Sequence, residues 1–324
     1  MTVRHLLADD DLTAVEQAEV LELGLALRAD RYARRPLDGP RAVAIIFDKP
    51  TLRTQLSFST GVAELGGFPT VVDGNLAQIG TRESVADVAR VVGRQVSAIV
   101  WRTHGQDRLQ EMADHVDVPV VNALSDDYHP CQLLADLLTV REAFGDVAGR
   151  TLVYLGDGAN NMAHSYLLAC ATAGMDVRIV SPASHRPDPG VLARARDRAA
   201  ETGGACTVTD DLAAVDGADV VVTDTWVSMG QESQAGERKG EASPFVPFRV
   251  TADVMARAAA GAIFLHCLPA YRGVEVAAEV IDGPASRVWD EAENRLHAQK
   301  ALLAWLLERA GEGALAPSPA QVTG

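Results

Sequence analysis

Short apolar runs rich in β-branched residues alternate along the chain with longer segments whose apolar residues recur every three or four positions. Runs of the first kind predict strands, and segments of the second kind predict helices. In the first half the predicted strands are 41–47, 70–73, 98–102 and 119–123, and the predicted helices are 52–67, 83–95 and 133–144. In the second half the predicted strands are 151–157, 176–182, 205–209, 218–226 and 262–269, and the predicted helices are 161–174 and 189–203.

This alternation is typical of parallel sheets with helices on both faces. The polar, glycine-containing segment near 141–150 separates the two series, so the sequence predicts two α/β domains, residues 1–140 and 150–290. Residues 293–311 carry leucines at helical spacing and predict a strongly amphipathic helix. Residues 312–324 are rich in Pro, Gly and Ala and predict a flexible tail.

Composition narrows the class of protein. The net charge of −15 and the sequence pI near 4.9 argue against nucleic acid or a membrane surface as partner. The N-terminal residues lack the pattern of a secretory signal, and no apolar run reaches the ~18 residues of a membrane span. Four cysteines without paired or metal-binding spacing are expected to be reduced thiols in a cytoplasmic protein.

Polar residues follow the predicted strands of the first half, where ligands of open α/β sheets bind. Thr51, Arg53 and Thr54 follow the first strand, and either a helix cap or an anion-binding loop fits them. Arg102 ends a strand, and a single arginine at such a position more often forms a structural ion pair. Arg53 and Arg102 together, each at the end of a strand in the same half, favour a common anionic ligand. His129 and Gln132 open the helix that follows the fourth strand, and both side chains can hydrogen bond to a polar ligand.

The second half shows the same arrangement. The stretch LVYLGDGANN suggests a dinucleotide-binding turn, but Asn161 stands where the third glycine is required, so Asn160 and Asn161 are expected to cap a helix or bind a polar small molecule. Asp224 follows a strand, where it serves either as a turn cap or as a partner for an ammonium group. Cys267 also follows a strand, and the sequence does not decide whether it is a nucleophile.

Eight segments between residues 47 and 300 occur in an order that resembles the aspartate/ornithine carbamoyltransferase family. They are DKPTLRTQLSF, AQIGTRES, WRT, HPCQLLADL, GDGANNMAHS, TDTWVSMGQE, HCLPAYRG and ENRLHAQKA. TDTWVSMG and HCLP resemble the ornithine branch. The resemblance implies transfer of a carbamoyl group from carbamoyl phosphate to the δ-amine of ornithine, as in arginine biosynthesis, without metal or cofactor.

The resemblance also implies residue roles. The first domain would bind carbamoyl phosphate and would be completed by helix 293–311, and the second would bind ornithine. Carbamoyl phosphate would be held by Thr51, Leu52, Arg53, Thr54, Gln78, Arg102, His129, Gln132, Cys267, Leu268 and Arg295. Arg102, His129, Cys267 and Arg295 would take part in catalysis. Ornithine would be held by Asn161, Asp224, Ser228 and Met229.

Family members are built from trimers, so the resemblance implies a homotrimer in which Gln78 reaches into a neighbouring subunit's site. It also implies closure of the two domains, with the 226–243 loop folding over ornithine. Two positions depart from the family pattern: Gln55 replaces an arginine beside the phosphate motif, and Tyr271 stands where related motifs often have His or Phe. The alternatives are a carbamoyltransferase for putrescine, acetylornithine or lysine, and a Rossmann-type oxidoreductase.

Overall fold

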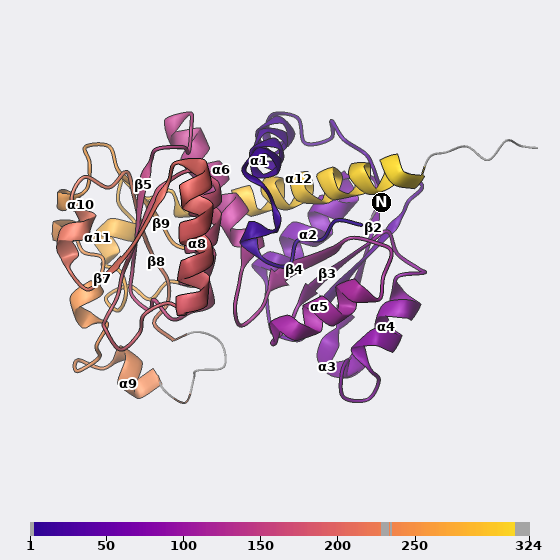
Figure 1. Ribbon diagram of the computed structural model, residues 1–324, viewed down its shortest axis with the longest axis horizontal. Coiled ribbons are helices and arrows are strands. Elements are labelled where there is room, and N and C mark those ends of the chain that lie inside the picture. The colour runs from indigo at the N-terminus through magenta and orange to yellow at the C-terminus, as the bar shows by residue number, and fades with distance from the viewer. Residues whose placement is uncertain (1–2, 228–232, 234, 315–324) are drawn as a thin grey trace, which may run out of the picture.

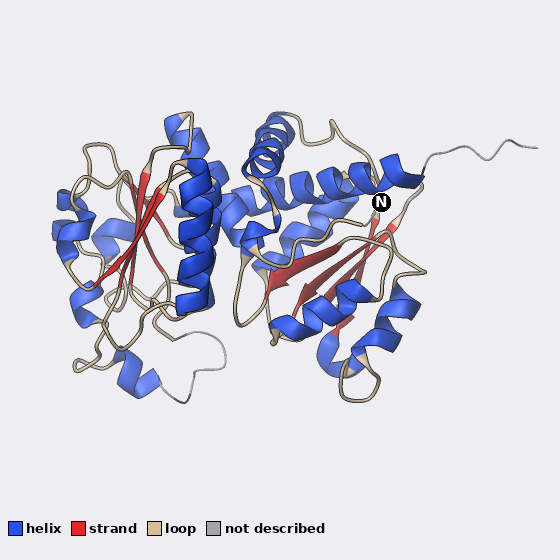
Figure 2. Ribbon diagram, in the orientation of Figure 1, coloured by secondary structure: helices blue, strands red, loops and turns tan. Residues whose placement is uncertain are grey.

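The computed structural model describes residues 3–227, 233 and 235–314, and it contains two parallel sheets, each flanked by helices (Figure 1; Figure 2). The first sheet has the strand order β2-β1-β3-β4, and the second has the order β7-β6-β5-β8-β9. All pairings within these two sheets are parallel. The predicted fold class, two α/β units with parallel sheets, is therefore confirmed.

The first sheet alternates its side chains between two helical layers. Its strands are β1 (Ala42–Phe47), β2 (Phe68–Asp73), β3 (Ala98–Arg102) and β4 (Val120–Leu124). Val43 and Ile45 pack toward α1 (Ala14–Ala29), α2 (Arg53–Glu64) and α6 (Pro130–Phe144). Ala44 and Ile46 pack toward α4 (Val85–Val92) and α5 (Gln106–Asp114). Because strand side chains alternate with a period of two, a fully apolar strand such as β1 must be covered on both faces.

The second sheet is built in the same way. Its strands are β5 (Thr151–Leu155), β6 (Asp176–Val180), β7 (Ala205–Thr209), β8 (Val220–Thr223) and β9 (Ile263–Leu265). One face packs against α7 (Asn161–Thr172) and α8 (Pro189–Thr202). The other face packs against α10 (Ala252–Arg257), α11 (Ala278–Ile281) and the start of the last helix. Short elements complete the chain: η1 (Asp9–Asp11), α3 (Gly74–Ala77), η2 (Leu212–Val215), α9 (Ala235–Lys239) and η4 (Val246–Phe248).

The last helix, α12 (Val288–Ala314), crosses back from the second sheet over the first unit (Figure 1). Its apolar residues join the core that contains α1, α2 and α6. Lys300 is fully buried there, and its Nζ donates to the Arg31 carbonyl at 2.5 Å and to Glu64 Oε2 at 2.6 Å. The predicted packing of the C-terminal helix on the first domain is confirmed.

Some elements differ from the sequence-based prediction. Helices α1 and α5 were not predicted, although a capping box formed by Thr13 and Glu16 marks the start of α1. Strands β8 and β9 end at Thr223 and Leu265, earlier than predicted, and the residues after them form loops. Helix α12 continues to Ala314, into the predicted tail, and residues 315–324 lie outside the described part of the chain. No helix of the described residues is both long enough and apolar enough to cross a membrane.

Candidate active site

A cavity of about 980 Å³ lies at the carboxyl ends of strands from both sheets. Its walls come from the residues after β1, β3, β4, β5, β8 and β9, together with one residue of α12. The lining includes Thr51, Leu52, Arg53, Thr54, Arg102, His129, Asn161, Asp224, Cys267, Leu268 and Arg295. Eleven of the fifteen predicted site residues therefore line one cavity, although they come from distant parts of the sequence.

The loop after β1 leads directly into α2, which begins at Arg53. Leu52 occupies the N-cap position, and no described side chain caps this helix. Of the two alternatives that the sequence left open, the side-chain cap is not formed, and Thr54 Oγ1 instead accepts a hydrogen bond from Arg295 Nη2 at 2.8 Å. The first N–H groups of α2 are thus left without a side-chain cap at the cavity, which suits an anion.

Arg53 connects the two sides of the cavity. Its Nη2 donates to the carbonyl of Leu268 at 2.8 Å, across from the loop that follows β9. Leu268 has a φ of 57°, an uncommon conformation for a leucine. A strained backbone conformation of this kind persists only where the surrounding structure holds it in place. Such conformations are concentrated at functional sites.

Three arginines place positive charge around the first-domain side of the cavity, and His129 lies among them. Burial, together with the neighbouring Arg295 and Arg53, lowers the pKa of Arg102 to about 10. Burial lowers the pKa of His129 well below its ordinary value, and Arg295, Arg102 and Arg53 act in the same direction, so its imidazole is neutral. Buried nitrogens of His129 (Nδ1) and Arg295 (Nε) have no hydrogen-bond partner among the described residues. An anion at this position would relieve the repulsion between these groups and supply the missing acceptor for Arg295.

Gln132 lies one turn into α6, behind the cavity wall, and it is not among the lining residues. Its Nε2 donates to Asp136 Oδ1 at 2.8 Å and to Glu291 Oε1 at 3.0 Å. These contacts leave its Oε1 buried and without a partner among the described residues. The amide oxygen of Gln132 is therefore available as an acceptor, although the cavity does not reach it in this structure.

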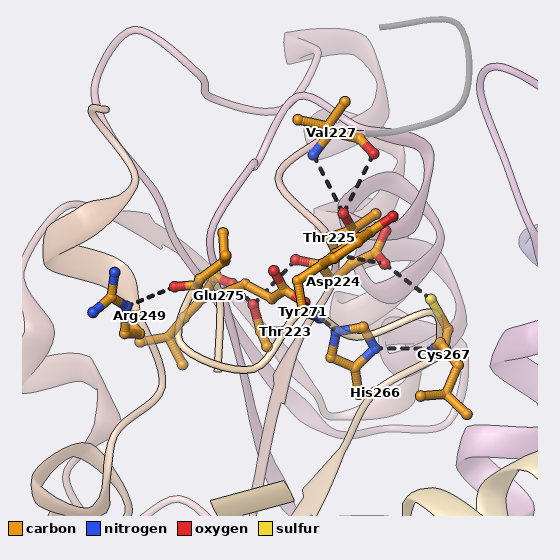
Figure 3. Close-up of polar contacts among 12 residues, drawn as sticks. Thr223, Asp224, Thr225, Val227, Arg249, His266, Cys267, Tyr271 and Glu275 are labelled. Atoms are coloured by element: carbon orange, nitrogen blue, oxygen red, sulfur yellow. Dashed lines mark hydrogen bonds and ion pairs between the residues drawn. The ribbon is translucent and has the colours of Figure 1, made fainter. Parts of the chain in front are cut away.

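The second-domain side of the cavity carries a carboxyl and a thiol, which Figure 3 shows close together. Cys267 Sγ donates to Asp224 Oδ1 at 3.1 Å, and the same oxygen accepts the backbone N–H of Thr225 at 2.7 Å. Burial raises the pKa of both groups, and the Asp224 carboxylate raises that of Cys267 further. The thiol of Cys267 is thus protonated and is a hydrogen-bond donor here. Asn161 lies on the same side and donates to the Ser125 carbonyl at 2.9 Å, while Asn160 caps α7.

Asp224, His266 and Cys267 also bring possible metal-ligand atoms within 4.8 Å of one another. Both nitrogens of His266 already have protein partners, however. Nδ1 accepts the Leu268 backbone N–H at 3.0 Å, and Nε2 lies 3.3 Å from Glu275 Oε1 (Figure 3). A metal ion could use His266 only if one of these hydrogen bonds broke.

The glycine-containing turn after β5 is filled by the protein's own side chains. A Cβ added to Gly158 would lie 2.6 Å from Ser181 Oγ and 2.7 Å from the His185 carbonyl. Asp157 is buried in an ion pair with Arg238. Because this turn is occupied, it does not offer the space that a dinucleotide pyrophosphate needs.

Three other predicted residues are not part of the cavity lining. Gln78 follows α3 with a φ of 50°. Ser228 and Met229 lie outside the described residues. The sequence reasoning also missed Lys49, which is buried at the cavity and paired with Asp126. Its position inside the motif DKPTLRT, directly after a strand, was the available signal.

The fold and the cavity define a two-domain α/β protein that gathers cationic groups on one side of a cavity and faces them with a carboxyl and a thiol. Residues 4–142 match the model of the aspartate/ornithine carbamoyltransferase carbamoyl-P binding domain. Residues 148–306 match the Asp/Orn binding domain of the same family. The chain belongs to the aspartate/ornithine carbamoyltransferase family.

Relatives and solved structures agree over nearly the whole chain. An ornithine carbamoyltransferase of Clavibacter michiganensis subsp. michiganensis is 60% identical over 307 residues, which are 94% of this chain and 99% of that protein. The structure of ornithine carbamoyltransferase from Pyrococcus furiosus has a TM-score of 0.89 at 42% identity, covering 95% of this chain and 98% of the other. An acetylornithine transcarbamylase complexed with acetylcitrulline has a TM-score of 0.84 at 31% identity, covering 94% of this chain and 99% of the other.

Proposed function

We propose that this chain transfers the carbamoyl group of carbamoyl phosphate to the δ-amine of L-ornithine, giving L-citrulline and phosphate. The observation that carries the proposal is the convergence of Arg53, Arg102, Arg295 and His129 on one cavity that also contains Asp224 and Cys267. Relatives that are 57–60% identical over nearly the full chain are ornithine carbamoyltransferases, which favours ornithine over other amines.

In this proposal the phosphate lies at the start of α2, between the free N–H groups of that helix and the side chains of Thr51, Arg53 and Thr54. Arg102, His129 and Arg295 hold the carbamoyl end, and neutral His129 donates one hydrogen bond to its oxygen. The neutral amine nitrogen attacks the carbamoyl carbon, negative charge develops on the carbamoyl oxygen, and the C–O bond to phosphate breaks. The departing phosphate takes the proton that the nitrogen loses as citrulline forms. Fixed cationic donors stabilise that charge, and holding both substrates in one cavity supplies the remaining acceleration.

Asn161, Asp224, Ser228 and Met229 are proposed to bind the amino-acid part of ornithine. A carboxylate at Asp224 would attract the α-ammonium of ornithine. Acetylornithine lacks this charge because its α-nitrogen is an uncharged amide, whereas putrescine keeps both amines and lacks the α-carboxylate. Cys267 and Leu268 would lie between the two substrates. The protonated thiol of Cys267 is suited to hydrogen bonding rather than to nucleophilic attack.

We also propose a homotrimer with shared sites and a cytoplasmic location. Exposed apolar side chains gather on adjoining elements of the first domain: Leu52, Leu56, Phe68, Val71 and Leu76. They lie on α2 or directly before it, on the edge strand β2 and on α3. Unpaired apolar edges of this kind favour burial in an interface. Gln78 follows this surface and would reach a neighbouring site. The four cysteines are free thiols, as expected in the cytoplasm.

The direct test is citrulline formation from carbamoyl phosphate, measured with ornithine, acetylornithine, lysine and putrescine. We expect activity with ornithine that exceeds activity with each other amine. Activity with a different amine and none with ornithine would overturn the substrate. Arg53→Ala should weaken carbamoyl-phosphate affinity by more than ~2 kcal/mol. Gln55→Arg should change it little, because Gln55 is exposed and does not line the cavity.

A further inference from the structure

Arg108, on α5, contacts three separate segments without lining the cavity. Its Nη1 donates to Asp48 Oδ2 at 2.9 Å and to Thr103 Oγ1 at 2.8 Å. Its Nη2 donates to the carbonyl of Ile79 at 2.6 Å. One guanidinium group therefore joins the loop after β1, the loop after β3 and the segment after α3.

Thr103 and Ile79 lie directly next to proposed site residues in the sequence, and Asp48 lies three positions before Thr51. Asp48 directly precedes the segment that contains Lys49 and the phosphate-binding residues, and Thr103 directly follows Arg102. Ile79 directly follows Gln78, the residue proposed to serve a neighbouring subunit. This coincidence at three unrelated segments indicates a role in arranging the site.

Asp48 is the centre of this arrangement. Its Oδ2 accepts hydrogen bonds from Trp101 Nε1 at 3.1 Å and from Thr103 Oγ1 at 2.6 Å, in addition to Arg108. The Asp48 side chain is 8% exposed. A Cβ added to Gly74 would lie 1.8 Å from Asp48 Oδ1, so the turn into α3 requires glycine at that position. The carboxylate is thus enclosed by the same segments that Arg108 joins.

The Arg108 guanidinium is also held in a fixed orientation. Its Cζ lies 4.9 Å from the centre of the Trp101 ring, and the side chain is only 24% exposed. A planar fork with several donors can serve Asp48, Thr103 and Ile79 at once, whereas a lysine offers one nitrogen on a flexible stem. A lysine at this position could keep the ion pair with Asp48 but not the contact with Ile79 as well.

We propose that Arg108 is a positioning residue that sets the geometry of the carbamoyl-phosphate site by joining the loop at Asp48, the loop at Thr103 and the Gln78–Ile79 segment. It does so without touching substrate. The proposal rests on the proposed function for the identity of the substrate and for the role of Gln78. In this proposal one side chain positions both the anion-binding residues of its own subunit and the Gln78 segment that would serve the neighbouring subunit.

The test compares Arg108→Lys with wild type in steady-state kinetics for both substrates. We expect KM for carbamoyl phosphate to rise about tenfold or more, since displaced donors form weaker charge-assisted hydrogen bonds to the substrate. KM for the amine substrate should change less than twofold, because none of the Arg108 contacts described above lies in the second domain. Equal increases of both KM values, or an unchanged KM for carbamoyl phosphate, would overturn the proposal.

Arg150→Lys is the matched control. Arg150 also lies over an aromatic ring, 4.7 Å from the centre of Phe144, and pairs with a carboxylate, Asp219, at 3.2 Å. It is not part of the cavity lining. Arg150→Lys should therefore leave KM for carbamoyl phosphate unchanged. A similar rise in this control would mean that loss of a stacked arginine acts through general stability, and the proposal would be overturned.

Two further measurements cover other outcomes. The first is a double-mutant cycle with Gln78→Ala. In the Gln78→Ala background, Arg108→Lys should raise KM for carbamoyl phosphate by less than it does in wild type. Strictly additive effects of the two substitutions would overturn the proposed link between Arg108 and Gln78. If Arg108→Lys does not fold, Thr103→Val removes one partner and should raise KM for carbamoyl phosphate to a smaller extent. If wild type makes no citrulline with any amine, the proposed function fails. The inference about Arg108 is then tested by the binding of inorganic phosphate to wild type and to Arg108→Lys. Equal phosphate affinities of the two proteins would overturn it.

Discussion

The substitution Arg295→Met should affect two properties differently. It should leave the ligand-free protein at least as stable as wild type and weaken its affinity for phosphate. Arg295 is 3% exposed, and its charge lies near those of Arg102 and Arg53. The fall in the pKa of Arg102 to about 10 corresponds to ~3 kcal/mol of unfavourable free energy for its charged form. Burial is the largest cause of this shift and Arg295 is the next, so the substitution should remove part of this unfavourable free energy.

Replacing a buried ion pair by apolar side chains of similar volume is often neutral or stabilises a protein by about 1–4 kcal/mol, and we take this range as the upper bound for removing the buried charge of Arg295. Against this stands the loss of the hydrogen bond to Thr54, about 1 kcal/mol. The ligand-free variant should therefore be at least as stable as wild type, by up to about 3 kcal/mol, and its Tm should not be lower.

Binding of phosphate should change in the opposite direction. Charge-assisted hydrogen bonds contribute about 1.5–3 kcal/mol each, so losing Arg295 should weaken phosphate affinity by a factor of roughly 10 to 150. Differential scanning calorimetry with and without phosphate measures both effects, since a ligand that binds only the folded state raises Tm. Wild type should show a phosphate-dependent increase that Arg295→Met largely lacks.

Arg309→Met is the control on the same helix. Arg309 is more exposed, lies over the Trp305 ring and pairs with Glu19 far from the cavity. It should keep the full phosphate-dependent increase in Tm. The reasoning is refuted if ligand-free Arg295→Met is less stable than wild type by more than ~1 kcal/mol while its phosphate response is retained.

Three further predictions follow from buried ionisable groups. Cys267 should react slowly with iodoacetamide at pH 8, and Asp224→Asn should speed the labelling, because the carboxylate helps to raise the thiol pKa; mass spectrometry of the labelled cysteine measures this. Glu64→Gln should lower the free energy of unfolding by about 3–5 kcal/mol in urea titrations, because Lys300 would lose its buried partner. The pKa of His129 is depressed in the folded protein, so as pH falls below about 6.5 the unfolded chain binds a proton before the folded protein does. The free energy of unfolding should therefore decrease from pH 7 to pH 5.5, and it should decrease less in His129→Gln. Equal decreases in the two proteins would contradict this.

Much of the fold was accessible from local patterns. The apolar runs at 41–47, 98–102 and 151–157 predicted buried parallel strands, because a strand covered on both faces must be apolar at every position. Polar residues after these runs predicted a ligand site at the carboxyl ends of the sheets. Helices α1 and α5 escaped this reasoning. Helix α1 lacks a clear alternation of polar and apolar faces, and only its capping box marks it.

Several features depended on contacts between distant segments. The sequence left open whether Thr54 caps α2, and the structure shows that its hydroxyl instead accepts a hydrogen bond from Arg295, which is 241 residues away in the sequence. The neutral state of His129 arises from burial and from arginines on three other segments. The contacts of Arg108 with Asp48, Thr103 and Ile79 have no local signal either.

The sequence by itself determined the two parallel-sheet units, the acidic surface charge and the residue types available at each strand end. These properties follow from short-range periodicity and composition, which are written into neighbouring residues. Only the tertiary structure decided which strand ends share one cavity, which buried charges face each other and which hydrogen bonds remain open to a ligand. Those properties depend on burial and on distances between atoms of different segments, and the pKa of a group depends on the same two quantities.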